Sequence, residues 1–293
     1  MASSFDAFLQ QAWADHADLP DAVAARLRTD TPAPQSADQL AALVRLVVHL
    51  CGEHCGAFDD GRWRLDALAC HPLADASVQS ALRVGVAGLS LAETGSAGRT
   101  DFSLEELIRS EAAAAAISLG RGQTARAMAL LRTARERLTA SPNVDGAVHR
   151  PLAVACNNMA WELHDRGSAR SAADTAAMLD IAAASRMHWA KAGTWLEVER
   201  ADYGLALCHL SAGLPDLASS FAAQCLAACT QNDAPPCEHF SAHEALARAQ
   251  HARGDQAASA RSVAAAEAAF AKLPASDQDA SRKTLTALQA LPR

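Results

Sequence analysis

The sequence is poor in aromatic residues and in the β-branched runs that favour strands. Aromatic side chains make up 4% of its 293 residues, and runs of valine, isoleucine or threonine are few. Alanine and leucine dominate instead, and both residues favour helix. The sequence therefore predicts an all-α protein.

The chain also lacks a long apolar run and an excess of basic residues. Its longest apolar segments, 40–50 and 112–117, are far shorter than the ~20 residues of a membrane-spanning helix. The formal net charge of −7 argues against a nucleic-acid-binding surface over the whole protein, because such a surface is normally basic. Residues 1–8 contain Asp6 and no basic side chain before an apolar stretch, which is unlike a secretory signal. We therefore expect a cytoplasmic protein that binds neither membranes nor nucleic acid.

Sequence motifs of the common enzyme classes are absent. The chain has no GxxxxGKS/T loop, no GxGxxG after a strand, no HExxH and no GxSxG. Asp59 and Asp60 begin like an aspartate-rich metal motif of isoprenoid enzymes, but Trp63 stands where that motif needs a further acidic residue. We therefore expect a protein that is not an enzyme.

What the sequence does contain is an internal repeat marked by four glycines. Each glycine follows an alanine by seven residues and precedes another small residue by five, and apolar residues follow it at nine and twelve. The alanines are Ala115, Ala160, Ala206 and Ala247, the glycines Gly122, Gly167, Gly213 and Gly254, and the second small residues Ala127, Ala172, Ala218 and Ser259. Glycine lets the chain turn, and small residues let neighbouring helices approach closely. The pattern predicts antiparallel helical hairpins stacked into an α-solenoid, a class that usually binds partners rather than catalyses.

We expect about seven hairpins in three regions. Irregular hairpins occupy residues 1–95, repeats occupy 96–275, and a capping helix occupies 276–293, with a linker at 94–100. Ser103 and Glu106 form a capping-box pattern at the start of the first repeat. The expected helices are 4–15, 20–28, 38–54, 60–70, 77–93, 103–119, 124–138, 152–166, 169–184, 194–212, 216–230, 238–253, 256–273 and 277–291.

The small residues at Ala206, Gly213, Ala218 and Cys225 resemble those of the tetratricopeptide repeat (TPR), whose two helices pack through such positions. The resemblance covers about residues 103–273. Successive glycines are 45, 46 and 41 residues apart, whereas the standard repeat has about 34 residues. The extra residues lengthen each helix by roughly 1.5 turns, which is similar to the TPR-like superhelices of bacterial regulators and peptide-sensing receptors. A HEAT-like solenoid is the alternative.

The resemblance implies a concave face, lined by the first helix of each hairpin, that holds a protein or peptide segment. The candidate binding residues are Arg109, Asn157, Trp161, His164, Arg200, Tyr203, Glu244 and Arg248. Arg200 and Arg248 are suited to pairing with carboxylates, and Trp161 and Tyr203 offer flat contact area. We therefore expect an acidic or C-terminal segment as partner. The alternative is that Trp161 belongs to the core between repeats and that the arginines are solvated.

Two groups of cysteines and histidines are candidate metal ligands. Cys51 and Cys55 are four residues apart, so both thiols face one side of a helix, and an antiparallel helix brings Cys70 towards them. The first group is His49, Cys51, His54, Cys55, Cys70 and His71, and the second is Cys225, Cys229, Cys237, His239 and His243. Either group has donors suited to zinc or copper. Because free cysteine is usually buried, we expect core packing and no cofactor, and a metal- or thiol-based sensor is the alternative.

Overall fold

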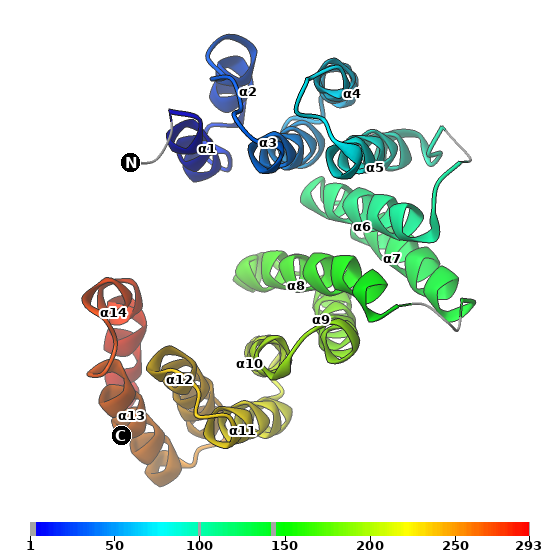
Figure 1. Ribbon diagram of the computed structural model, residues 1–293. Coiled ribbons are helices and arrows are strands. Elements are labelled where there is room, and N and C mark those ends of the chain that lie inside the picture. Colours follow the sequence, from blue (N-terminus) through cyan, green and yellow to red (C-terminus); the bar gives the residue numbers. More distant parts are fainter. Residues whose placement is uncertain (1–3, 99–100, 142–144, 293) are drawn as a thin grey trace. The chain divides into compact units, whose positions relative to one another are not determined.

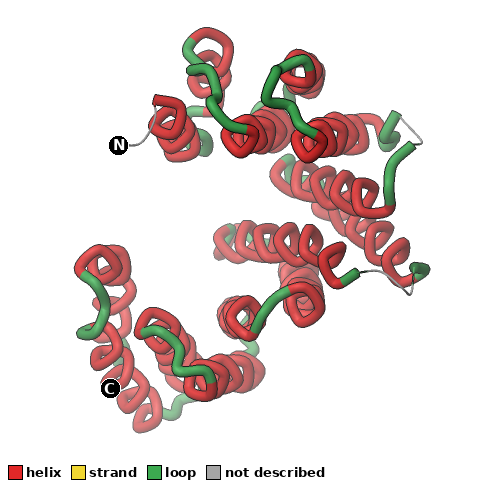
Figure 2. The backbone as a smooth tube through the Cα atoms, in the orientation of Figure 1, coloured by secondary structure: helices red, strands yellow, loops and turns green. Residues whose placement is uncertain are grey.

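The computed structural model describes residues 4–98, 101–141 and 145–292. Over these residues the chain folds into fourteen α-helices, with short 3₁₀ and π segments and no β-strand (Figures 1 and 2). This confirms the all-α prediction. None of the helices in the described ranges is long and apolar enough to cross a membrane.

The helices form two compact units, residues 1–144 and 145–293. We call them the first unit and the second unit and describe each by itself. The three-part division at residues 95 and 275 stays a prediction. The last two positions of the expected linker at 94–100 lie outside the described residues.

Seven α-helices make up the first unit, coloured from blue to green in Figure 1. They are α1 (Ser4–Asp15), α2 (Pro20–Thr29), α3 (Ala37–His49), α4 (Phe58–Ala69), α5 (Ala76–Thr94), α6 (Leu104–Gly120) and α7 (Thr124–Thr139). Side chains cap several of them, since Ser36 accepts the Gln39 N–H at the start of α3 and Asp75 accepts the Val78 N–H at the start of α5. The expected helix at 38–54 is α3 followed by a π-helical turn, η1 (Leu50–His54).

The second unit holds the other seven α-helices. They are α8 (His149–Asp165), α9 (Ala172–Ala192), α10 (Trp195–Ser211), α11 (Pro215–Gln231), α12 (Pro236–Ala252), α13 (Gln256–Phe270) and α14 (Ala275–Gln289). Each helix packs against the next one in the chain, and α10 also packs against both α8 and α12. The first helices of three successive hairpins are therefore neighbours, and this arrangement places the candidate site described below.

The four repeat glycines lie in the turns between paired helices. Their φ angles are positive, at 74°, 52°, 75° and 80° for Gly122, Gly167, Gly213 and Gly254. Glycine adopts this conformation without strain, whereas residues with a Cβ atom are strained in it. The four alanines seven positions earlier are all buried. The four glycines therefore lie in turns and the four alanines lie between helices, as the repeat predicts.

The second helix of one hairpin departs from the predicted pattern. A 3₁₀ turn, η3 (Gly167–Ala169), follows Gly167 and delays the start of α9 to Ala172, whereas the other three second helices begin two residues after their glycine. The delay rotates the buried face of α9, so Ala172 is exposed rather than in the core. The helix also continues to Ala192, eight residues beyond its expected end at 184.

Glu106 joins α6 to α5 in the first unit. Its carboxylate accepts hydrogen bonds from the Ser80 hydroxyl at 2.8 Å, from the Ser103 backbone N–H at 3.1 Å and from the guanidinium of Arg83. Ser103 accepts the Glu106 N–H in return, which confirms the predicted capping box. Burial raises the pKa of Glu106, but these donors outweigh it and lower the pKa from 4.5 to about 2.

Replacing Glu106 with glutamine should destabilise the fold by about 1–2 kcal/mol at neutral pH, because an amide loses the charged hydrogen bonds to α5. The folded-state pKa lies below the unfolded one, so the carboxylate stabilises the protein above about pH 4.5 and this advantage is lost as the pH falls towards 2. Urea unfolding of both proteins from pH 7 to pH 3 measures the effect. A free-energy difference that does not shrink in acid would show that the Glu106 charge contributes nothing.

Candidate functional site

The candidate site is a pocket of about 390 Å³ in the second unit. The first helices α8, α10 and α12 supply most of its wall, and α9 supplies one tryptophan. The lining residues are Asn157, Trp161, Trp189, Glu197, Glu199, Arg200, Ala201, Tyr203, Glu238 and Ser241. Four of the predicted binding residues, Asn157, Trp161, Arg200 and Tyr203, therefore meet in one cavity.

Helix α10 contributes half of the lining residues, because these residues are spaced along it so that several share one side. Glu197, Arg200 and Ala201 recur at intervals of three and four residues, which places them on the same side of a helix. Thr194 starts this helix with a capping box, in which the Glu197 carboxylate accepts the Thr194 backbone N–H at 2.8 Å. The Thr194 hydroxyl also donates to this carboxylate at 2.6 Å. The Glu197 carboxylate is thus held at the first turn of α10, and these hydrogen bonds lower its pKa.

Three aromatic rings form the apolar part of the wall. The rings of Trp161 and Tyr203 have centroids 6.1 Å apart, close enough to contact each other. Trp189 is 8% exposed and packs against Ala153 and Ala201. Because packing holds these rings in place, the pocket exists before any ligand arrives.

Both predicted ligand-binding arginines of the second unit are already paired within the chain. Arg200 forms a salt bridge of 2.5 Å with Glu238 on α12. Arg248 donates at 3.0 Å to Glu244, which also accepts the Tyr203 hydroxyl at 3.0 Å. Both carboxylates are buried. The Arg200–Glu238 pair and the Tyr203–Glu244 hydrogen bond join α10 to α12, whereas the Arg248–Glu244 pair lies within α12. The lining residues include three glutamates and one arginine, which gives the pocket a negative formal charge.

Glu199 is the most buried charged residue of the pocket wall, with 1% of its surface exposed. One carboxylate oxygen accepts the Cys225 thiol at 2.6 Å and the Cys229 thiol at 3.4 Å. Burial and the nearby Glu238 raise its pKa, although the two thiols act in the opposite direction. Its second oxygen is buried and has no hydrogen-bond partner among the described residues, which leaves one polar atom of the pocket wall unsatisfied.

The structure brings together only part of each predicted metal cluster. In the second unit, Cys225 and Cys229 meet Glu199, and these three donors lie within 4.8 Å of one another. Cys237 lies beside Glu238 instead, and His239 lines a different cavity together with His243. The carboxylate was missed because sequence spacing within α11 says nothing about the facing helix.

The residues of the predicted cluster in the first unit likewise do not all meet at one place. Cys51 is 1% exposed and in the core, Cys55 is half-buried and Cys70 is exposed. His54 faces His49 and a third histidine, His16, which no spacing rule linked to them.

The other predicted binding residues lie outside the pocket. Arg109 belongs to the first unit and is 3.8 Å from Glu105 on the same helix. His164 contacts its neighbour Asp165 at 3.0 Å and packs edge-on against the Trp161 ring. Both side chains contact neighbours on their own helix, and their role in binding stays a prediction.

Sequence reasoning missed several pocket residues. Trp189 lies beyond the expected end of its helix, although buried residues at Ile181, Ser185 and His188 continue the helical spacing and would have extended it. Glu199 and Glu238 carry no signal in the sequence, because charged residues are normally exposed and their burial depends on partners from other helices.

Comparisons with protein-family models, with curated proteins and with solved structures found no match to this chain.

The cysteines should differ sharply in reactivity. Burial raises the pKa of Cys51 to about 11 and that of Cys208 to about 12, and the hydrogen bond with Cys229, burial and the Glu199 carboxylate raise that of Cys225. Since the thiolate is the reactive form, a disulfide reagent at pH 7.5 should label the exposed Cys70 first and the buried thiols only after unfolding.

Mass spectrometry of the labelled protein identifies the cysteines that react, and a Cys70→Ser variant should lose the fast phase. Rapid labelling of Cys225 or Cys229 in the folded protein would contradict the burial of both thiols.

Proposed function

We propose that this chain is a TPR-like α-solenoid that binds a protein or peptide segment and has no catalytic role. The glycine turns, the alanine contacts between helices and the packing of α10 against α8 and α12 support this architecture. In helical-repeat proteins the first helices of successive hairpins line one face, and that face commonly binds the partner. The pocket opens among three such helices.

One observation carries the proposal: aromatic rings and carboxylates converge in a preformed pocket. Trp161, Trp189 and Tyr203 provide three ring systems, each with a negative face that attracts a cation. Glu199 adds a buried oxygen without a partner in the described chain. A hydrogen-bond donor from a ligand would satisfy this oxygen, which otherwise costs the fold stability.

The charges of the pocket favour a basic side chain in the bound segment. An arginine or lysine of the partner combines a positive charge, several N–H donors and a long apolar stem. Its head group matches Glu197 and Glu199, and its stem matches the aromatic rings. The earlier expectation of an acidic segment depended on Arg200 and Arg248, whose guanidinium groups are paired with Glu238 and Glu244. Opening these pairs would leave buried carboxylates unpaired, which is costly.

A thiol-based sensor is the second candidate function, and the cluster of Glu199, Cys225 and Cys229 is the observation that favours it. The raised pKa of Cys225 counts against it, because sensor cysteines are usually accessible thiolates. Peptide binding accounts for more of the pocket residues than the thiol chemistry does.

A random peptide library displayed on phage, selected against the immobilised protein, tests the peptide-binding function. We expect the selected peptides to share an arginine or lysine, and synthetic versions should lose affinity when that residue is replaced by glutamate. Trp161→Ala should weaken their binding about thirtyfold, or about 2 kcal/mol, because a central aromatic contact is lost. Calorimetric titration gives the dissociation constants, and added salt should raise them.

Trp63→Ala is the matched control, because Trp63 is 67% exposed and lies on α4 of the first unit. It should leave peptide affinity unchanged. Selected peptides that are acidic and depend on Arg200 would restore the acidic-segment hypothesis. Peptides whose affinity is the same for the Trp161→Ala and wild-type proteins would exclude the pocket as the binding site.

A further inference from the structure

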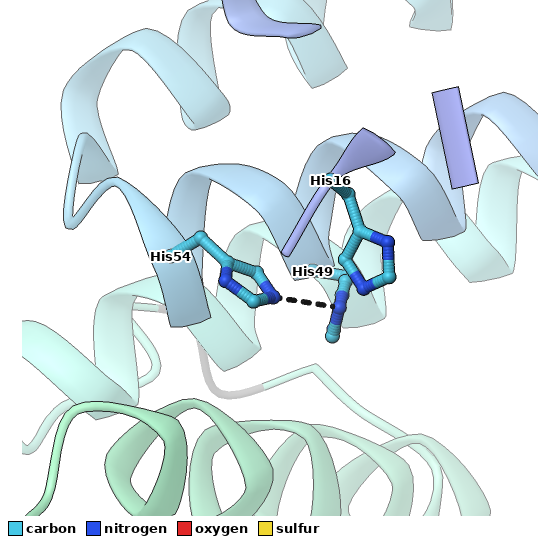
Figure 3. A group of neighbouring side chains, drawn as sticks. All are labelled: His16, His49 and His54. Carbon is cyan, nitrogen blue, oxygen red and sulfur yellow. Dashed lines mark hydrogen bonds between the residues drawn. The ribbon is translucent and has the colours of Figure 1, made fainter. Parts of the chain in front are cut away.

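Three histidines of the first unit form a cluster that the proposed peptide pocket does not use. His16 follows the end of α1, His49 is the last residue of α3, and His54 ends the π-helical turn η1 (Figure 3). The ring centroid of His16 lies 4.9 Å from that of His49 and 5.0 Å from that of His54. One nitrogen from each ring lies within 4.8 Å of the others, and all three residues are half-buried.

The π-helical turn explains how His49 and His54 come together. Residues five apart on an α-helix point about 140° away from each other. In η1 the Cys55 N–H donates to the Leu50 carbonyl at 2.9 Å, five residues earlier, and this wider turn brings His54 back to the side of His49. π-Helical turns are rare and frequently lie at functional sites.

Glycine makes this wide turn compatible with the core. A Cβ atom at Gly52 would lie 2.7 Å from a side-chain carbon of Ile117 on α6, closer than non-bonded carbons approach. The backbone of η1 can therefore pack directly against α6 only with glycine at this position. The three histidines are half-buried, whereas Gly52 is buried.

The distance between two of the ring nitrogens matches that of two ligands around one ion. Nε2 of His49 and Nε2 of His54 are 3.1 Å apart, and two ligand nitrogens of a tetrahedral zinc ion are about 3.3 Å apart when each Zn–N bond is about 2.05 Å. Two imidazole nitrogens at this distance cannot both present lone pairs to each other. Either a proton or a metal ion must lie between them.

Neighbouring oxygen atoms fix the protons on the other ring nitrogens. Nδ1 of His49 lies 2.8 Å from the Glu53 carboxylate, and Nδ1 of His16 lies 2.6 Å from the Trp13 carbonyl oxygen. A carbonyl only accepts, so His16 donates through Nδ1 and its Nε2 carries the lone pair. Such a carboxylate or carbonyl partner is typical of histidines that bind metal, because it orients the ring and raises its basicity.

We propose that His16, His49 and His54 bind a divalent transition-metal ion such as zinc through one nitrogen each, with a fourth position left to solvent. Three neutral imidazoles are ligands that zinc and copper accept and that magnesium and calcium do not favour. Trp13 covers one side of the cluster, with its ring 5.1 Å from that of His49.

The test uses the full-length protein, freed of metal with a chelator and then titrated with zinc alone. We expect one equivalent at this site by calorimetry, and the same equivalent by elemental analysis after desalting. Cobalt(II) should give the intense visible absorption of a tetrahedral site. Glu53→Gln should weaken binding roughly tenfold, since loss of such a second partner costs about 10–100-fold in affinity.

His16→Ala and His54→Ala should each weaken zinc binding further than Glu53→Gln, and circular dichroism verifies that the variants remain folded. His239→Ala is the matched control from the other predicted cluster. A Cys225→Ser/Cys229→Ser double variant removes the thiols near Glu199. Both controls should keep the equivalent of zinc and the cobalt spectrum.

Zinc binding that survives His16→Ala and His54→Ala, or that disappears with the Cys225/Cys229 substitutions, would overturn the proposal. Absence of any stoichiometric binding at micromolar zinc would overturn it as well. The outcome is independent of peptide binding, because His16, His49 and His54 all belong to the first unit and the peptide pocket to the second.

Discussion

Contact between helix backbones through alanine is the interaction on which the rest of the structure depends. Alanine side chains that are completely buried, such as Ala115, Ala127, Ala218 and Ala247, fill the faces between paired helices. Alanine loses no side-chain entropy when it is buried, but each methyl group contributes only about 0.8 kcal/mol of hydrophobic stabilisation. Many contacts per pair are then needed, which accounts for helices of 15 to 21 residues in the second unit.

The same contacts leave room for function in the second unit. Helices that approach through alanine on one face still carry large residues on another, and Trp161, Arg200 and Tyr203 are such residues on α8 and α10. Ion pairs such as Arg200 with Glu238 connect the first helices across the pocket wall. The buried alanines therefore hold the two helices of each hairpin together. The aromatic and charged residues that line the pocket lie on other faces of the same helices.

Helix boundaries and turns were largely predictable because they are set locally. The expected helix at 4–15 is α1 itself, and the four repeat glycines have the positive φ that their spacing indicated. The prediction was wrong for both ends of α9, because a 3₁₀ turn delays its start and the helix continues to Ala192. Helical spacing in the sequence groups four residues that line the pocket, Asn157, Trp161, Arg200 and Tyr203, and their role in binding stays a prediction. Glu199, His16 and the ion pairs depend on contacts between helices, which no local pattern encodes.

The π-helical turn that follows α3 contains one residue more than the corresponding α-helical turn. One added residue rotates everything beyond it by about 100° around the helix axis. Leu50–His54 is the only described segment that has this form, and the rotation decides whether His54 faces His49 or faces elsewhere. The packing of α3 against its neighbouring helices does not by itself fix the direction in which His54 points. The position of one imidazole therefore depends on the form of a single turn, and an α-helical winding of the same five residues would point His54 away from His49 while leaving the residues of α3 itself unchanged.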